Sequence, residues 1–305
     1  MGEPTTRPLK VGLAIVPFEG VPGEGHRWEN LVAQARAAEA VGFDSVWVPD
    51  HVLFRRPEKE PEGAWEAWSL LAALAAATTR VELGPFVLCT AWRNPALIAK
   101  MADTVDEISG GRLVLALGAG WNRAEFDALG APFDHRYARF AEALTIIHGL
   151  LRTGHVDFEG TYYSARDSEL RPRGPRPQGP PIMIGTTGEK MLRLTARYAD
   201  RWNIDWRNQP EQVEPFQTAV DAACAEVGRD PATLERTAGI MVDLPGYPAR
   251  SRDTSPPLTG SPDEIAEGLR RHRQTGIAHA MIWLNTADAA GVEAFAPILE
   301  SLDRP

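Results

Sequence analysis

Cysteine is scarce in this chain of 305 residues, which contains only Cys89 and Cys224. Two cysteines cannot build a disulfide framework, and the seven histidines show no spacing typical of metal ligands. No apolar run approaches the roughly 18 residues that a membrane span needs. The first residues also lack the apolar segment of a signal peptide. We therefore expect a cytoplasmic protein with no metal site and no membrane association.

An excess of positive charge is also absent, because 41 acidic residues outnumber 32 basic ones and give a net charge of −9. This balance argues against nucleic acid as a partner. The sequence has neither a G-x-S-x-G elbow nor an H-E-x-x-H pair, which argues against common hydrolases. The apolar content of 44% and charged content of 24% are typical of a globular protein. An enzyme that acts on a small molecule is the expected class.

What the sequence does contain is a regular alternation of apolar strands with amphipathic helices. The apolar segments Val81–Leu88 and Leu113–Leu117 show no polar alternation, which is typical of parallel strands covered on both faces. The other expected strands are Val11–Pro17, Ser45–Val48, Pro181–Ile184, Arg201–Ile204, Thr237–Leu244 and Ala278–Leu284. The expected helices are Trp28–Val41, Pro95–Ile108, Arg139–Leu151, Glu189–Ala199, Pro210–Val227, Pro262–Thr275 and Val292–Leu302. Eight such units predict an α/β fold, a (β/α)8 TIM barrel in a single domain over residues 1–305.

Two segments break the alternation and are predicted to be insertion loops at the C-terminal face of the strands. Residues 152–180 contain the run RPRGPRPQGPP, whose prolines and glycines exclude a helix. We expect this insertion to cross the barrel face. A second irregular stretch, Pro245–Pro262, follows the seventh strand, and long loops in compact domains are often lids or binding loops.

Asp50 and His51 follow the second strand, at the end where parallel barrels build their active sites. Imidazole is the side chain best suited to proton transfer near neutral pH, and a neighbouring carboxylate could orient it or contact a ligand. His51 could equally be a loop histidine whose nitrogens bond to backbone groups. The residues alone leave both interpretations open.

A glycine-rich turn follows the fourth strand and consists of Gly118, Ala119, Gly120 and Trp121. The glycines allow a ligand to approach the backbone closely, and the tryptophan could supply a flat apolar wall. The alternative is tight packing within the barrel, with the tryptophan in the core.

A second such turn follows the fifth strand and consists of Gly185, Thr186, Thr187 and Gly188. It precedes a helix, and the N–H groups and dipole at a helix N-terminus bind phosphate well. Lys190 and Arg193 could add positive charge there. The alternative is an ordinary strand-to-helix turn in which threonine caps the helix.

Taken together, these segments resemble the luciferase-like monooxygenase superfamily, and in particular its coenzyme F420-dependent oxidoreductases. The matching segments are GFDSVWVPDH at 42–51, RNP at 93–95, DEISGGRLVLALGAGW at 106–121, EGTYY at 159–163, PPIMIGTTGEK at 180–190 and YADRWN at 198–203. Each is weak evidence alone, but their order and spacing are specific to the superfamily. The resemblance covers nearly the whole chain and implies a TIM barrel with a reduced flavin-like cofactor in its mouth.

The resemblance also implies a role for each residue that matches the family pattern. Asp50 would contact the deazaflavin ring, and His51 would be the catalytic group that transfers a proton beside the hydride centre. A non-prolyl cis peptide bond is implied behind the ring, between Phe86 and Val87. The residues that the resemblance places along the ring or its ribityl chain are Ala119, Gly120 and Trp121. The residues that it places around the cofactor phosphate are Gly185, Thr186, Thr187 and Gly188.

Two positions depart from the sugar-phosphate dehydrogenases of this branch. Arg55 stands where they have a tryptophan soon after the histidine, and Trp121 stands where they have a glutamate. These departures argue against oxidation of glucose 6-phosphate. The glutamate tail of coenzyme F420 would run past basic residues such as Arg55 or Lys190.

Three functions are compatible with this resemblance. The leading hypothesis is an oxidoreductase that transfers a hydride between F420 and a small organic substrate. The alternative is an FMN-dependent, two-component monooxygenase of the same fold. The third is a flavin-binding barrel without turnover, used for storage or sensing. As partners we expect a second copy of the chain in a homodimer, and a flavin or F420 reductase that supplies the reduced cofactor.

Overall fold

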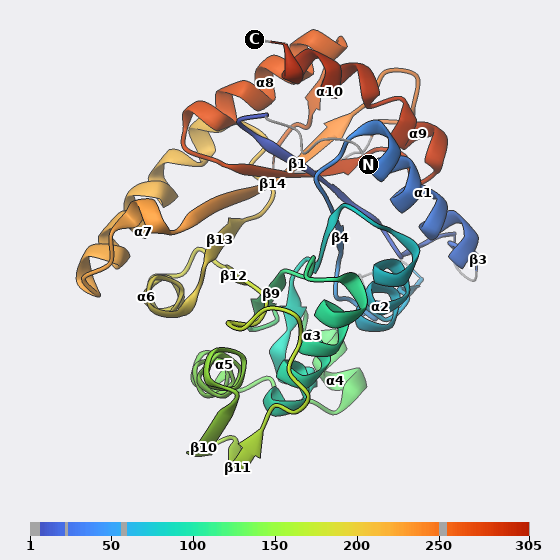
Figure 1. Ribbon diagram of the computed structural model, residues 1–305. Helices are drawn as coiled ribbons and strands as arrows, with labels where there is room; N and C mark the ends of the chain where they lie inside the picture. The colour runs from blue at the N-terminus through green and yellow to red at the C-terminus, as the bar shows by residue number, and fades with distance from the viewer. Residues whose placement is uncertain (1–6, 22–23, 56–59, 250–254, 305) are drawn as a thin grey trace.

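The main sheet is a ring of parallel strands with helices around it (Figure 1). The structure is a computed structural model that describes residues 7–21, 24–55, 60–249 and 255–304. In chain order, the strands of the ring are β1 (Lys10–Ala14), β4 (Ser45–Val48), β7 (Glu82–Pro85), β8 (Leu88–Cys89), β9 (Leu115–Gly118), β12 (Ile182–Gly185), β13 (Arg201–Ile204), β14 (Glu235–Asp243) and β16 (His279–Leu284). A short strand, β15 (Leu258–Thr259), pairs with β14.

The ring closes through its third strand, which is divided into β7 and β8. β7 pairs with β4, and β8 pairs with β9. Leu83 of β7 also bridges Leu113: its N–H donates to the Arg112 carbonyl at 3.0 Å, and its carbonyl accepts from the Val114 N–H at 2.8 Å. The described residues therefore form the predicted (β/α)8 barrel, with β7 and β8 as two pieces of one barrel strand.

Helices follow the strands and cover the outside of the ring. They are α1 (Trp28–Val41), α2 (Ala67–Ala77), α3 (Pro95–Ser109), α5 (Arg136–Thr153), α6 (Glu189–Tyr198), α7 (Glu214–Glu226), α8 (Pro262–Gln274) and α10 (Ala296–Asp303). Short helices lie between them: η1 (Thr90–Trp92), α4 (Arg123–Leu129), η2 (Pro210–Gln212), η3 (Pro231–Thr233) and α9 (Ala289–Glu293). Among the residues that the structure describes, no helix has the length and apolar character needed to cross a membrane.

Two expected helices are each divided in the structure. The predicted helix over 210–227 separates into η2 and α7, and the one over 292–302 separates into α9 and α10. α7 and α10 each carry a proline in the first turn. Because proline has no N–H to donate to the preceding turn, it starts a new helix instead of continuing the previous one.

Polar side chains fill the interior of the ring near β1, β4 and β16. The Trp47 indole donates to Ser45 Oγ at 2.7 Å, and this oxygen lies 2.8 Å from Nε2 of His279. A Cβ atom at Gly12 would lie 2.2 Å from the same Ser45 oxygen, so glycine is needed there. His279 and Ser45 are fully buried. The barrel interior at the amino-terminal ends of these strands is therefore a packed core.

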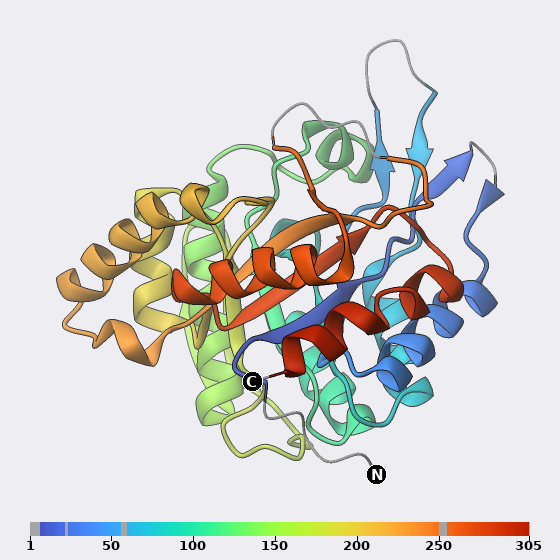
Figure 2. The ribbon, with the colours of Figure 1, turned by 90° about the horizontal axis from the view of Figure 1, so that it is seen from above.

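Two hairpins extend the carboxyl-terminal end of the barrel, as Figure 2 shows. They are β2 (Glu19–Val21) with β3 (Glu24–Gly25), and β5 (Leu53–Phe54) with β6 (Glu62–Gly63). The irregular stretch 245–262 follows β14, and its residues 250–254 lie outside the described part of the chain. Loops therefore extend this face of the barrel, but these two hairpins are not the segments that we predicted to be insertions.

The insertion over 152–180 does not cross that face as we expected. It forms the hairpin β10 (His155–Glu159) and β11 (Ser164–Glu169), and then runs beneath the opposite end of the barrel (Figure 2). The Gly174 N–H donates to Asp103 of α3 at 2.9 Å, and the Arg176 guanidinium donates to Asp106 at 2.9 Å. The insertion joins the end of α5 to the start of β12. It therefore lies at the amino-terminal end, where the two buried carboxylates of α3 hold it.

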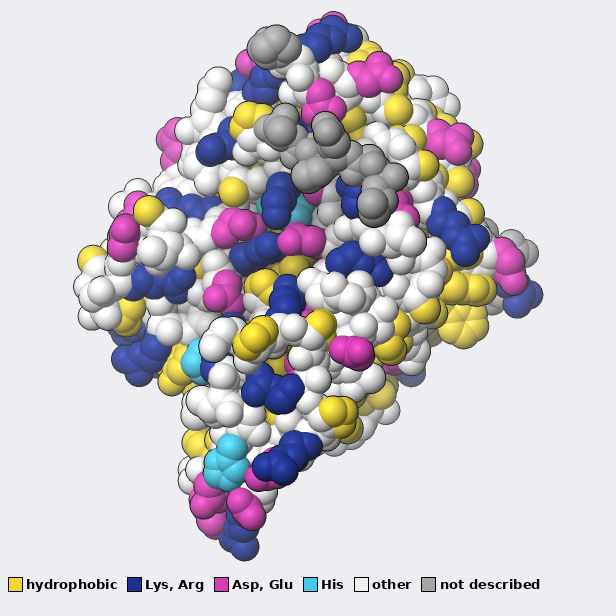
Figure 3. Space-filling view, viewed as in Figure 1, with side chains coloured by type: hydrophobic (Ala, Val, Ile, Leu, Met, Phe, Trp, Pro, Cys, Tyr) yellow, Lys and Arg dark blue, Asp and Glu magenta, His cyan; other side chains and the backbone are white. Residues whose placement is uncertain are grey.

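The amino-terminal end of the barrel carries a network of opposite charges. The Arg201 guanidinium donates to both Glu82 oxygens at 3.0 Å and pairs with Glu235 at 3.1 Å, while Lys10 lies 3.6 Å from Glu82. Figure 3 shows basic and acidic side chains interleaved over this end of the molecule. The charges are paired with one another, so this end is assigned to stability.

We predict that His279 makes the fold sensitive to mild acid. Burial lowers the pKa of His279 to about 3, against the opposing charge of Glu82 and with the charges of Arg201 and Lys10. The unfolded chain takes up a proton below its ordinary pKa of 6.5 whereas the folded protein does not. The free energy of unfolding should therefore fall as pH drops from 6.5 towards 3, by up to about 1.4 kcal/mol per pH unit.

Urea unfolding at several pH values between 7 and 5 measures this dependence, in a range above the titration of most carboxylates. The variant His279→Gln should lose part of the slope, while His155→Gln, at an exposed histidine of β10, should keep it. Equal slopes in the unmodified protein and His279→Gln would contradict the assignment.

Candidate active site

The carboxyl ends of the strands surround a cavity of about 1280 Å³. Ligand pockets commonly measure about 300–1,000 Å³, so this one has room for a cofactor and a second molecule. All the site residues predicted from the sequence line it: Asp50, His51, Phe86, Val87, Ala119, Gly120, Trp121, Gly185, Thr186, Thr187 and Gly188. The structure therefore brings them together, while the role of each one stays a prediction.

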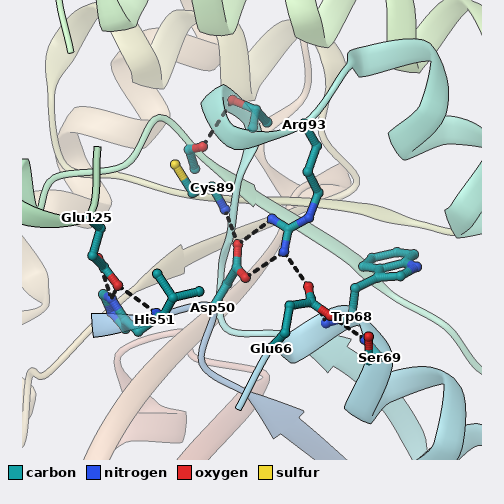
Figure 4. Close-up of polar contacts among 11 residues, drawn as sticks. Asp50, His51, Glu66, Trp68, Ser69, Cys89, Arg93 and Glu125 are labelled. Atoms are coloured by element: carbon teal, nitrogen blue, oxygen red, sulfur yellow. Dashed lines mark hydrogen bonds and ion pairs between the residues drawn. The ribbon is translucent and has the colours of Figure 1, made fainter. Parts of the chain in front are cut away.

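His51 is held by a buried carboxylate from another part of the chain, Glu125 (Figure 4). Its Nδ1 lies 3.0 Å and 3.2 Å from the two Glu125 oxygens. The same carboxylate accepts the N–H groups of Val52 at 2.7 Å and Leu53 at 3.2 Å. These bonds fix the imidazole ring and place its proton on Nδ1, so Nε2 is the nitrogen that can serve a substrate.

Glu125 is a site residue that the sequence did not reveal. It is 1% exposed, and it lies on α4, a helix of seven residues. Burial raises the pKa of Glu125, but the hydrogen bonds and charge of His51 and the two backbone donors outweigh it and leave the pKa below its ordinary value. An acidic residue soon after the glycine-rich turn was the signal, but no short-range pattern connects it with His51.

Asp50 anchors the same turn on its other side (Figure 4). Its carboxylate accepts two hydrogen bonds from the Arg93 guanidinium, at 2.8 and 2.9 Å, and one from the Cys89 N–H at 2.8 Å. Arg93 also donates to Glu66 at 2.6 Å, and Glu66 caps the N-terminus of α2. Burial raises the pKa of Asp50, and the Arg93 hydrogen bonds oppose that rise.

The contacts of Asp50 bear on its predicted role. Both of its oxygens bind protein groups and its side chain is fully buried. The observed function of the carboxylate is therefore to hold the turn that carries His51 against the loop that follows β8. A direct contact with a cofactor ring stays a prediction.

Phe86 and Val87 lie between β7 and β8 and are joined by a cis peptide bond, as the resemblance implied. A Cβ atom at Gly118 would lie 2.8 Å from a Val87 methyl group, and one at Gly185 would lie 3.2 Å from the other. Val87 therefore fits between two glycines and forms a ledge in the cavity wall. We call Val87, Gly118 and Gly185 the ledge.

Gly120 serves packing as well as the cavity. Its φ is +76°, and a Cβ atom there would lie 2.6 Å from both Cys89 Sγ and the Phe126 ring. Side chains other than glycine are strained by such a φ. The Arg136 guanidinium also donates to the Gly120 carbonyl at 2.9 Å. The packing alternative therefore holds for Gly120, whereas Trp121 is 66% exposed and is not a core residue.

The turn from Gly185 to Gly188 leads into α6. The Gly188 N–H donates to the Thr186 hydroxyl at 3.2 Å, but Gly188 is itself the N-cap of α6 and no side chain caps this helix, so the alternative of threonine capping is wrong. Nothing lies within 4 Å of a Cβ atom built on Gly188, so the backbone there is approachable. The first N–H groups of a helix have no partner within it, and they can bind an anion.

The two cations expected beside this turn differ. Lys190 Nζ lies over the ring of Tyr137, 5.9 Å from its centre, and Tyr137 lines the cavity. Arg193, by contrast, donates to Glu226 and Glu189, each at 2.6 Å. The expectation that Arg193 adds free positive charge is wrong because two carboxylates already neutralise it. Arg55 is not among the described residues that line the cavity.

Comparison with known proteins identifies the family. Residues 9–244 match the family described as luciferase-like monooxygenase. A 5,10-methylenetetrahydromethanopterin reductase of Archaeoglobus fulgidus is 31% identical over 245 residues, which are 80% of this chain and 67% of that protein. An F420-dependent hydroxymycolic acid dehydrogenase of Mycobacterium tuberculosis is 31% identical over 245 residues, which are 78% of this chain and 64% of that protein. The chain thus spans about two thirds of the length of these relatives.

A solved structure gives the same fold. An F420-dependent secondary alcohol dehydrogenase, in complex with an F420-acetone adduct, superimposes with a TM-score of 0.82 at 21% identity. The match covers 96% of this chain and 99% of that one. At this identity the likeness supports the fold alone, and the family model together with the curated relatives supports the classification. This chain therefore belongs to the luciferase-like monooxygenase family, whose members are enzymes.

Proposed function

We propose that this protein is an F420-dependent oxidoreductase that transfers a hydride between the deazaflavin and a small organic substrate. The observation that carries the proposal is the His51–Glu125 pair, which faces the same cavity as the ledge and the turn before α6. A histidine bound to a buried carboxylate is suited to proton transfer. The M. tuberculosis relative, which is named as F420-dependent, supports the choice of cofactor.

The residues present fit such a cofactor. The ledge offers a narrow, apolar surface against which a flat ring system can lie, and the approachable backbone at Gly188 suits a phosphate group. Lys190 would add positive charge beside the phosphate. When bound, F420 exchanges two electrons with the substrate as a hydride, and the protein supplies orientation and electrostatics.

His51 would hold the proton that accompanies the hydride. In substrate reduction, Nε2–H gives its proton to the oxygen that was the carbonyl of the substrate; in oxidation, Nε2 takes the proton from the hydroxyl. Glu125 keeps the other nitrogen protonated and stabilises the positive charge that His51 carries when both nitrogens are protonated. Glu125 is thus a positioning residue, and His51 is the proposed catalytic residue.

The name of the matched family favours one alternative, an FMN-dependent monooxygenase. Such an enzyme would take reduced FMN from a reductase partner and would consume oxygen, whereas hydride transfer with a deazaflavin would not. Oxygen uptake during turnover separates the two. In either case we propose a cytoplasmic homodimer, to which α3 would offer the exposed side chains of Leu97 and Ile108.

The variant His51→Ala should lower kcat by roughly 10²–10⁴-fold, because it removes the proposed proton-transfer group. The dissociation constant for F420 should change far less, since the proposed cofactor contacts come from other residues. Turnover and F420 fluorescence titration measure the two effects separately. His155→Ala, at an exposed histidine outside the cavity, is the matched control. Undiminished turnover in His51→Ala would remove this residue from the mechanism.

The variant Glu125→Gln should lower kcat by about tenfold or more, because a neutral amide stabilises the charged imidazole less well than a carboxylate does. The pH–rate profile should also move, with its acidic midpoint at lower pH. Asp127→Asn changes the same charge on the exposed side of α4 and should alter neither kcat nor the profile. A Glu125→Gln enzyme that loses stability but keeps its pH–rate profile would show a purely structural role.

A further inference from the structure

One side of the cavity, around His51, is formed by aromatic side chains. We call this set the aromatic wall; its members are Phe18, Phe54, Phe86, Trp121, Trp206 and Trp283. They come from β16, from segments that follow other barrel strands, or from hairpin β5–β6, and meet only because the barrel is closed. The sequence did not reveal most of this wall, because long stretches of chain separate its members.

The rings of the wall lie side by side. Trp206 is 4.8 Å from Trp283 and 5.6 Å from Phe86, measured between ring centres. Phe18 continues the row, at 6.3 Å from Trp283 and 5.2 Å from Phe54. The row ends at His51. Its ring centre lies 4.4 Å from that of Phe54 and 5.7 Å from that of Trp121, and these two rings are 6.3 Å apart. A ligand that lies on this wall therefore has His51 at its edge.

The acidic residues that line the cavity would select substrates by a second property, their charge. Glu19, Glu62 and Asp205 line it in addition to the two carboxylates already paired with Arg93 and His51. Asp205 directly precedes Trp206 of the wall. Its side chain is exposed and lines the cavity.

Positively charged side chains contribute little to the charge of the cavity lining that the structure describes. Among the described residues that line the cavity, the one arginine is Arg136, and no lysine lines it. Its guanidinium donates to the Gly120 carbonyl and stacks over the Phe133 ring, 4.1 Å from its centre. A carboxylate or phosphate placed on the aromatic wall would therefore meet like charges and, among the described residues that line the cavity, no lysine and no arginine other than Arg136, which is a basis for rejection.

We propose that the substrate is a planar, largely apolar molecule without an acidic group, which lies on the aromatic wall with its carbonyl or hydroxyl group towards His51. This inference rests on the proposed function, because it takes the His51 side of the cavity as the substrate side. Flat apolar rings gain both buried area and favourable ring contacts on such a surface. The wall thus selects for shape, and Asp205 with its acidic neighbours selects against anions.

Two probes with the same ring system test the selection: 2-naphthaldehyde, which is neutral, and 6-formyl-2-naphthoate, which adds a carboxylate. Isothermal titration calorimetry measures their binding to the protein saturated with F420 and, separately, to the protein without cofactor. The neutral probe should bind about tenfold more tightly than the anionic one. Because binding is measured without turnover and also without F420, failure of the substrate inference is distinguishable from failure of the proposed function.

Two pairs of variants locate the effect. Asp205→Asn should strengthen binding of the anionic probe at least about threefold and leave the neutral probe unchanged, because only the charge is removed. Asp157→Asn, at an exposed position of β10, should change neither. Trp206→Leu should weaken the neutral probe about tenfold, and Trp28→Leu, at an exposed tryptophan of α1, should not. Equal or tighter binding of the anionic probe, or an unchanged preference in Asp205→Asn, would overturn the proposal.

Discussion

The backbone bridge between Leu83 and Leu113 closes the barrel, and the candidate site depends on that closure. Once the third and fourth barrel strands are neighbours, the eight strands direct their carboxyl ends to one mouth. Groups as distant in the sequence as His51, Glu125 and Gly188 then line one cavity. The interruption between β7 and β8 lies at the same place and supplies the ledge. Closure and site construction are therefore parts of one arrangement.

Two carboxylates hold the turn that carries His51. Glu125 binds the imidazole and the backbone that follows it, while Asp50 joins the turn to Arg93 and, through it, to Glu66 at the start of α2. Each carboxylate is buried, and removing either partner of such a pair leaves a costly unpaired group. The imidazole is consequently fixed before any ligand binds. Such preorganisation is what proton transfer beside a bound cofactor requires.

Most of the fold could be predicted because the barrel strands have an unambiguous pattern. The strand Arg201–Ile204 and the helix Trp28–Val41 have the predicted bounds, since each combines clear apolar spacing with a defined end. Helix α2 was not anticipated because its sequence, AWSLLAALAAA, is apolar nearly all round and shows no amphipathic period. The insertion over 152–180 was misplaced because prolines exclude a helix but do not indicate at which end of a barrel a loop lies.

The candidate site, like the fold, has a part that could be predicted from the sequence and a part that could not. His51 and the two glycine-rich turns follow predicted strands directly, so the rule for strand ends was sufficient to find them. Glu125, the aromatic wall and the pairing of Arg193 with Glu226 depend on contacts between distant segments, and no local pattern reports such contacts. What the sequence could predict is therefore the location of the site, whereas the groups that tune its chemistry required the structure.

The choice of cofactor is the central claim, and binding measures it most directly. Purified protein would be titrated with oxidised F420 and, in parallel, with FMN, each followed by fluorescence. The account predicts a dissociation constant for F420 in the micromolar range or below, and binding of FMN weaker by about tenfold or more. The reverse preference would contradict it and would point to an oxygen-consuming enzyme that depends on a flavin reductase.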